Sequence, residues 1–128
     1  MKPSTLEWVE KAEDDWEMAQ RAYRARKRPS YDAACFHAQQ CLEKYLKARL
    51  NEAGSSIKKT HDLAALLDDV LPAEPNWLLL RVMLDPLTKY AVLYRYPGYN
   101  ATKIETKGVL TDCRAIRRII RTAFGLPV

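Results

Sequence analysis

The sequence predicts an all-α fold, an up-down antiparallel bundle of about five helices in a single domain over residues 1–128. Apolar residues recur at spacings of three and four, which is the period of a helix buried on one side. No segment alternates convincingly in the manner of a half-buried strand, and the loops are short enough to place consecutive helices antiparallel. With 48% hydrophobic and 29% charged residues, the composition is that of a globular domain and not of a disordered chain.

Two long helices open the chain. The first is expected over about residues 5–26, with an S-x-x-E capping box from Ser4 to Glu7 and an apolar stripe on one face. The second is expected over about residues 31–53, with Ser30 as its N-cap and Gly54 as its stop.

Three further helices complete the predicted bundle. A short one is expected over residues 61–71, with Thr60 as its cap. The next, over residues 75–94, is apolar nearly all round and is predicted to be the central buried helix, which Pro86 kinks or divides into two. The last, over residues 103–124, follows a T-x-x-E capping box that begins at Thr102.

Charge and cysteine content narrow the class of protein only slightly. The formal net charge of +5 is compatible with an acidic partner protein, a nucleotide or RNA, and selects none of them. The three cysteines have no CxxC spacing, so we expect buried apolar thiols in a reducing compartment. Without an apolar leader or membrane-length run, the sequence favours a cytoplasmic location and no membrane partner.

A polar stripe on the second helix is the first candidate site. His37, Gln40 and Lys44 are spaced so that their side chains share one helix face. They could hold an anionic or polar partner, or they could be ordinary solvated surface. With two histidines and no cysteine pair at ligand spacing, we expect no metal site. We expect no cofactor either.

Two other short segments could bind a ligand. Asp62 either stabilises a helix N-terminus or joins His61 in a site. Arg95 and Tyr96 follow the long apolar segment, where the arginine could pair with helix carbonyls or bind phosphate. Nearby tyrosines could stack on a base.

The last predicted helix carries a basic face. It comprises Arg114, Arg117, Arg118 and Arg121. This face is either solvated or a contact for an acidic partner or a nucleic-acid backbone.

Three stretches together resemble the HEPN family, the higher eukaryote and prokaryote nucleotide-binding domain. They are residues 31–48, the Thr-His-Asp-Leu run at 60–63, and the Arg-Tyr-Pro run at 95–97, within a resemblance that covers about residues 5–124. The resemblance implies an up-down helical bundle that forms a homodimer. It also implies pairing with a minimal nucleotidyltransferase in a module resembling a toxin–antitoxin system.

The resemblance also bears on catalysis. Family members that are metal-independent ribonucleases carry an arginine and a histidine four to six positions later, and no histidine follows Arg95 here. The resemblance therefore implies a non-catalytic protein that binds a nucleotide or a partner. The residues it assigns to that role are His37, Gln40, Lys44, His61, Asp62, Arg95 and Tyr96.

Two alternatives to this interpretation stay open. One is a metal-independent endoribonuclease in which Arg95 works with a displaced histidine, His37 or His61. The other is an inert subunit whose Tyr96 or Tyr99 receives a nucleotide from the partner enzyme.

Overall fold

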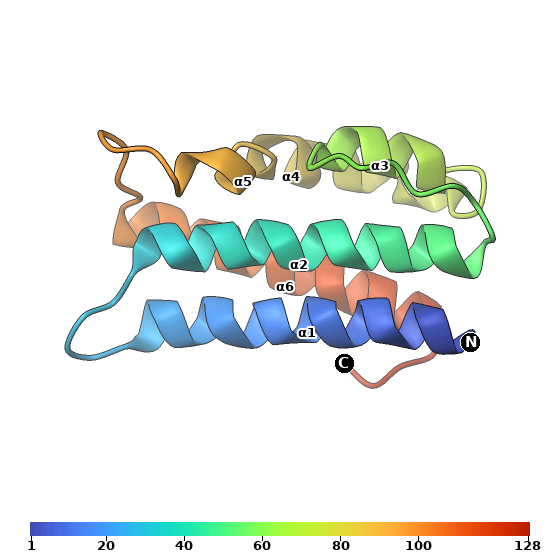
Figure 1. Cartoon of the computed structure of the whole chain (residues 1–128), viewed down its shortest axis with the longest axis horizontal. Helices are drawn as coiled ribbons and strands as arrows, with labels where there is room; N and C mark the ends of the chain where they lie inside the picture. Colours follow the sequence, from blue (N-terminus) through green and yellow to red (C-terminus); the bar gives the residue numbers. More distant parts are fainter.

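The computed structural model describes all residues 1–128, and every regular element in it is helical. Three long helices run the length of the molecule, and a layer of short helical segments covers α2 (Figure 1). In chain order the elements are α1 Pro3–Arg24, α2 Tyr31–Glu52, α3 Leu63–Val70, η1 Pro75–Leu80, α4 Arg81–Leu84, η2 Asp85–Leu87, α5 Tyr90–Leu93 and α6 Lys103–Ala123. The predicted all-α bundle is confirmed.

The centre of the bundle is α2, which packs against α1, α6, α3 and α5. Its small and apolar side chains, such as Ala38, Cys41 and Leu42, have no exposed surface. Small residues let neighbouring helices approach closely, so α2 can contact partners on all sides. All three cysteines are free and buried, as predicted, and burial raises the pKa of the Cys35 thiol to about 11.

The prediction that residues 75–94 form the central buried helix is wrong. This stretch divides into 3₁₀ turns and short α-helical turns, and Pro86 lies in the second 3₁₀ turn. Leu79 and Val82 are each 82% exposed, whereas Trp77, Leu80 and Leu84 point into the core. The segment is therefore a covering layer with one buried side, although its composition is apolar all round.

Several predicted helix ends are confirmed, and two are wrong. Ser30 caps α2, and Thr102 with Glu105 forms the capping box of α6. By contrast, α1 starts at Pro3 with Lys2 as its N-cap, so Ser4 lies inside the helix and makes no capping box. Proline at the first helical position has the backbone angle that a helix needs and lacks only an N–H that would be unpaired there.

The start of α3 also differs from the prediction. Its N-cap is Asp62, whose carboxylate accepts hydrogen bonds from the backbone N–H groups of Ala64 and Ala65. Thr60 instead accepts a hydrogen bond from the Asp62 backbone N–H. None of the helices combines the length and the apolar character that crossing a membrane would require.

Candidate functional site

Two members of the predicted polar stripe, a histidine and a lysine, meet at one carboxylate from the neighbouring helix. Asp15 of α1 lies between them, 2.8 Å from Nδ1 of His37 and 2.5 Å from Nζ of Lys44. The Asp15 residue is 7% exposed. Burial raises the pKa of its carboxyl group, but the hydrogen bonds from His37 and Lys44 more than offset this, so the pKa is lowered overall.

Because both oxygens of Asp15 are used in this way, His37 and Lys44 connect α1 to α2. A buried carboxylate needs such partners, since an isolated charge in the interior is costly. The first role of these two side chains is therefore to satisfy Asp15.

Gln40, the third member of the stripe, belongs to a different network. Its side-chain amide donates to Gln39 Oε1 at 2.7 Å and lies 3.4 Å from Glu43 Oε1. The buried Glu43 also lies 2.7 Å from Nδ1 of His61 and 2.9 Å from Nζ of Lys47. Burial raises the pKa of Glu43, and the bonds from Lys47 and His61 lower it by more, so the net shift is downward.

The Glu43 network fixes the loop before α3. Gln39 donates a hydrogen bond to the backbone carbonyl of His61 at 2.9 Å, while the His61 ring reaches Glu43. Asp62 is occupied as the cap of α3, the structural role that the sequence left open. His61 and Asp62 thus hold a loop against α2.

The segment after α5 is the exposed part of the predicted site. The Tyr94 ring stacks on Phe36 of α2 with 5.0 Å between ring centroids. Arg95 and Tyr96 are both exposed, and Arg95 makes no side-chain hydrogen bond or ion pair within the chain. The guanidinium is available to an external partner.

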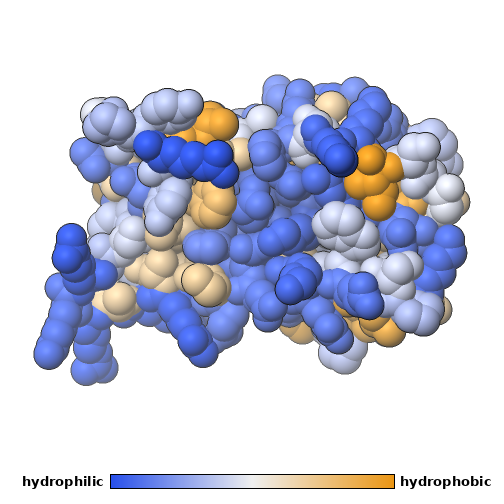
Figure 2. All heavy atoms as spheres, viewed as in Figure 1, coloured by the Kyte–Doolittle hydropathy of each residue, from blue (hydrophilic) through white to orange (hydrophobic).

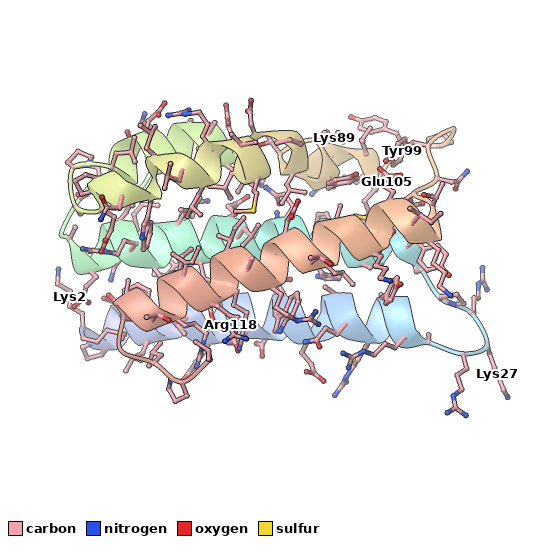
Figure 3. All side chains as sticks on the ribbon, turned by 180° about the vertical axis from the view of Figure 1, so that it is seen from behind. Lys2, Lys27, Lys89, Tyr99, Glu105 and Arg118 are labelled. Atoms are coloured by element: carbon pink, nitrogen blue, oxygen red, sulfur yellow. The ribbon has the colours of Figure 1, made fainter.

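The other end of this loop is anchored on α6. The hydroxyls of Tyr99 and Tyr90 both donate to the carboxylate of Glu105, the residue that also completes the capping box (Figure 3). Burial and the bond to Glu105 raise the pKa of Tyr99 to about 12. Arg95 and Tyr96 therefore project from a loop held at Tyr94 and at Tyr99.

The seven predicted site residues do not line one cavity. His37 and Lys44 bind Asp15, whereas Gln40 and His61 contact Glu43. Asp62 caps α3. Arg95 and Tyr96 lie apart from both networks, on the loop after α5. One link joins the first group to the loop. The His37 ring contacts the Phe36 ring edge-on, with 5.2 Å between ring centroids, and Tyr94 stacks on Phe36.

The predicted basic face of α6 is divided between surface and interior. Arg117 forms a two-pronged contact with Glu13 of α1, and Arg121 donates to the Tyr45 hydroxyl at 3.0 Å. Arg114 and Arg118 remain exposed. The four arginines thus do not form a continuous exposed face, because two of them compensate a carboxylate on α1.

The residues that sequence reasoning missed are the carboxylates Asp15, Glu43 and Glu105 as network centres, together with the Phe36 ring. A signal exists for Asp15. It lies three residues after Ala12 and four before Ala19, and both alanines are fully buried. A carboxylate on that apolar stripe implies cationic partners on the facing helix.

The protein is a helical bundle with an exposed Arg-Tyr loop, which is held by the stack of Tyr94 on Phe36 and by the bond from Tyr99 to Glu105. The chain belongs to the HEPN domain family, which it matches over residues 5–123. It is also similar to the crystal structure of TT1696 from Thermus thermophilus, with a TM-score of 0.76 and 25% sequence identity. That similarity covers 94% of this chain and 98% of TT1696. No curated protein matches the chain.

Proposed function

We propose that this HEPN protein is non-catalytic, that it binds a nucleotide through the loop at Arg95, and that it forms a homodimer. We further propose that its partner is a minimal nucleotidyltransferase, in a module of the toxin–antitoxin type. The observation that carries the proposal is the state of Arg95, whose side chain is exposed and has no partner within the chain. A guanidinium matches the oxygens of a phosphate, and exposed tyrosines on both sides offer faces for a base.

The non-catalytic part of the proposal is supported by the surroundings of the two histidines. Nδ1 of His37 is 2.8 Å from Asp15, and Nδ1 of His61 is 2.7 Å from Glu43. Both rings are thus engaged in networks that hold helices and loops together. Cleavage of RNA through its 2′-hydroxyl needs a base and an acid beside the reacting phosphate.

A thermal shift assay with ATP, GTP and AMP tests the binding function. A nucleotide that binds only the folded state raises the melting temperature. We expect a shift with the wild type that is lost in Arg95→Ala and kept in Arg118→Ala, an arginine that is also exposed but lies on α6. No shift with any of the three nucleotides would contradict the proposal.

The ribonuclease alternative is tested separately with RNA in the presence of EDTA. We expect intact RNA after prolonged incubation with the pure protein. Cleavage that disappears in both Arg95→Ala and His37→Ala would instead favour an active nuclease. His37 is the histidine to test first, because its ring contacts Phe36, on which Tyr94 stacks.

A second function, as acceptor of a nucleotide, is favoured by one contrast between two tyrosines. Tyr96 is 63% exposed, whereas the hydroxyl of Tyr99 is hydrogen-bonded to Glu105. In such a transfer the Tyr96 hydroxyl would attack the α-phosphate of a nucleoside triphosphate, lose its proton and release pyrophosphate. Mass spectrometry after co-expression with the partner should find a nucleotide adduct that Tyr96→Phe abolishes and Tyr99→Phe retains.

A further inference from the structure

A small cationic groove lies between the C-terminal half of α1 and the first half of α6. It has a volume of about 170 Å³, and three of its lining residues are Arg24, Lys107 and Arg114. None of its lining residues is acidic; the others are Gln20, Tyr23, Leu110 and Thr111. Three positive charges thus converge on one concavity without a compensating carboxylate.

The cations of this groove differ from most others along the long helices. Lys44, Lys47, Arg49 and Arg117, for example, each lie within 4 Å of a carboxylate. Arg24, Lys107 and Arg114 have no ion pair. Arg114 is instead held over the face of Trp16, with its guanidinium carbon 5.4 Å from the ring centroid. This contact orients Arg114 while leaving its charge uncompensated.

The groove adjoins the most basic end of the molecule, because Arg24, one of its lining residues, is the last residue of α1. The turn between α1 and α2 contains Arg26, Lys27 and Arg28, and Lys27 lies at the same end as Tyr99 (Figure 3). Strongly hydrophilic side chains protrude at this end (Figure 2). A second cavity of about 480 Å³ is lined by both Arg28 and Asn100, so this turn adjoins the loop that carries Arg95.

The charge counts along the chain agree with this picture. Residues 21–36 contain five Lys and Arg against one acid, and residues 89–107 contain four against one. Residues 1–20 contain two basic residues against six acids. The net positive charge of the protein is therefore concentrated at this end, although most of the 21 Lys and Arg lie elsewhere and are balanced by acids.

Aromatic rings accompany the cations. Tyr23 lines the groove, and its ring packs against Tyr31 at 5.9 Å between centroids. Tyr94 and Tyr96 are exposed on the adjoining loop. Cationic grooves with interspersed aromatic rings are typical of proteins that bind single-stranded nucleic acid, since the cations follow the backbone and the rings stack on bases.

We propose that the groove of Arg24, Lys107 and Arg114 binds the phosphodiester backbone of a single-stranded nucleic acid. An acidic protein would also be attracted by the charge, but its carboxylates would not stack on the tyrosine rings as bases do. This site goes beyond the nucleotide-binding function assigned to Arg95, because the groove lies on α1 and α6 and contains no residue of that loop.

The test is fluorescence anisotropy with an oligouridine of about twelve nucleotides, measured between roughly 50 and 200 mM salt. The groove variant is Arg24→Gln with Lys107→Gln and Arg114→Gln. We expect it to weaken binding about tenfold at low salt and to reduce the slope of log affinity against log salt by about two, since each neutralised phosphate contributes about 0.7. The matched control is Lys11→Gln with Lys59→Gln and Arg118→Gln, which removes the same charge from other exposed positions.

Each outcome decides the proposal. Loss confined to the groove variant supports it, whereas no binding by the wild type, or equal loss in both variants, overturns it. A polyglutamate peptide with the same charge as the oligouridine is the comparison ligand. If it binds the wild type as tightly as the oligouridine does, and the groove variant loses this binding too, the ligand is an acidic protein and the proposal is overturned. If melting shows that the triple variant is unfolded, Arg24→Gln with Lys107→Gln keeps the contact of Arg114 with Trp16 and repeats the test.

A final comparison separates this proposal from the one for Arg95. The groove variant should keep the thermal shift that mononucleotides produce, and Arg95→Ala should lose that shift while keeping most oligonucleotide affinity. Loss of both properties in the groove variant would place both ligands at one site and overturn the independence of the groove.

Discussion

The carboxylate of Asp15 on α1 lies 2.8 Å from Nδ1 of His37 and 2.5 Å from Nζ of Lys44 on α2. This relationship assigns a structural role to two residues that a sequence pattern would place in a binding site. It also means that substitutions of His37 or Lys44 change stability, so loss of binding in such variants needs a stability control.

Asp15→Asn should destabilise the fold by about 2 kcal/mol, because it removes the charge that two part-buried hydrogen bonds from basic side chains depend on. Urea unfolding at neutral pH would measure the loss. The neighbouring Asp14→Asn is the control, since Asp14 is exposed and should change stability by less than about 0.5 kcal/mol. Equal effects of the two changes would show that the contact with His37 and Lys44 contributes nothing.

The lowered pKa of Glu43 predicts a specific pH dependence of stability. Its ordinary pKa is 4.5, and the folded-state pKa lies below that, so the unfolded chain binds the proton more readily than the folded one. The stabilisation is therefore present above pH 4.5 and is lost as the pH falls through the folded-state value.

Urea titrations across this acidic range would test the effect of Glu43. The stability difference between wild type and Glu43→Gln should be largest near neutral pH, at about 2 kcal/mol, and should shrink on acidification. Glu7→Gln is the control, because the Glu7 side chain is exposed and forms no ion pair. A difference that does not vary with pH would contradict the assigned network.

Two arginines one position apart on α6 should behave differently. Arg117→Met breaks the contact with Glu13 and should cost about 2 kcal/mol, because the carboxylate between α1 and α6 loses its main partner. Arg118→Met removes an exposed, unpaired charge and should be close to neutral. Thermal unfolding of both variants would measure the difference. Similar melting temperatures would contradict the assignment of Arg117 to an ion pair and of Arg118 to the exposed surface.

The stack between Phe36 and Tyr94 should order the loop that carries Arg95. Phe36→Ala should cost about 1 kcal/mol for the lost aromatic contact and should increase hydrogen exchange over residues 94–98. Exchange in α3 should not change, since Asp62 caps that helix independently. Unchanged exchange in the loop would mean that Tyr99 and Glu105 suffice to hold it.

Local features of the fold were predictable from the sequence. The N-cap at Ser30 and the capping box at Thr102 depend on residues within a few positions of each other, and both are present. The central position of α2 was not predictable from hydropathy. Residues 75–94 are more apolar than α2, yet hydropathy alone does not tell which side of a helix another helix covers, and Leu79 and Val82 remain exposed.

The candidate site was predictable only in part. The spacing of His37 and Lys44 correctly places them on one face of α2, but their partner Asp15 lies on another helix, and pairing across helices is decided by tertiary packing. The same holds for Gln40, which is drawn into the Glu43 network. Arg95 differs because the Pro-Gly pair at 97–98 predicts a loop there, and loops lie at the surface.

The separation of charge along the molecule has a consequence for encounter rates. Acidic residues of α1 precede its basic end, and the α1–α2 turn lies at the opposite end of the molecule from the N-terminus (Figure 1). The protein is therefore an electric dipole, and an approaching polyanion exerts a torque that turns the basic end toward it before contact. This steering acts over roughly the Debye length, about 8 Å at physiological salt, so it accelerates association while leaving dissociation to the short-range contacts.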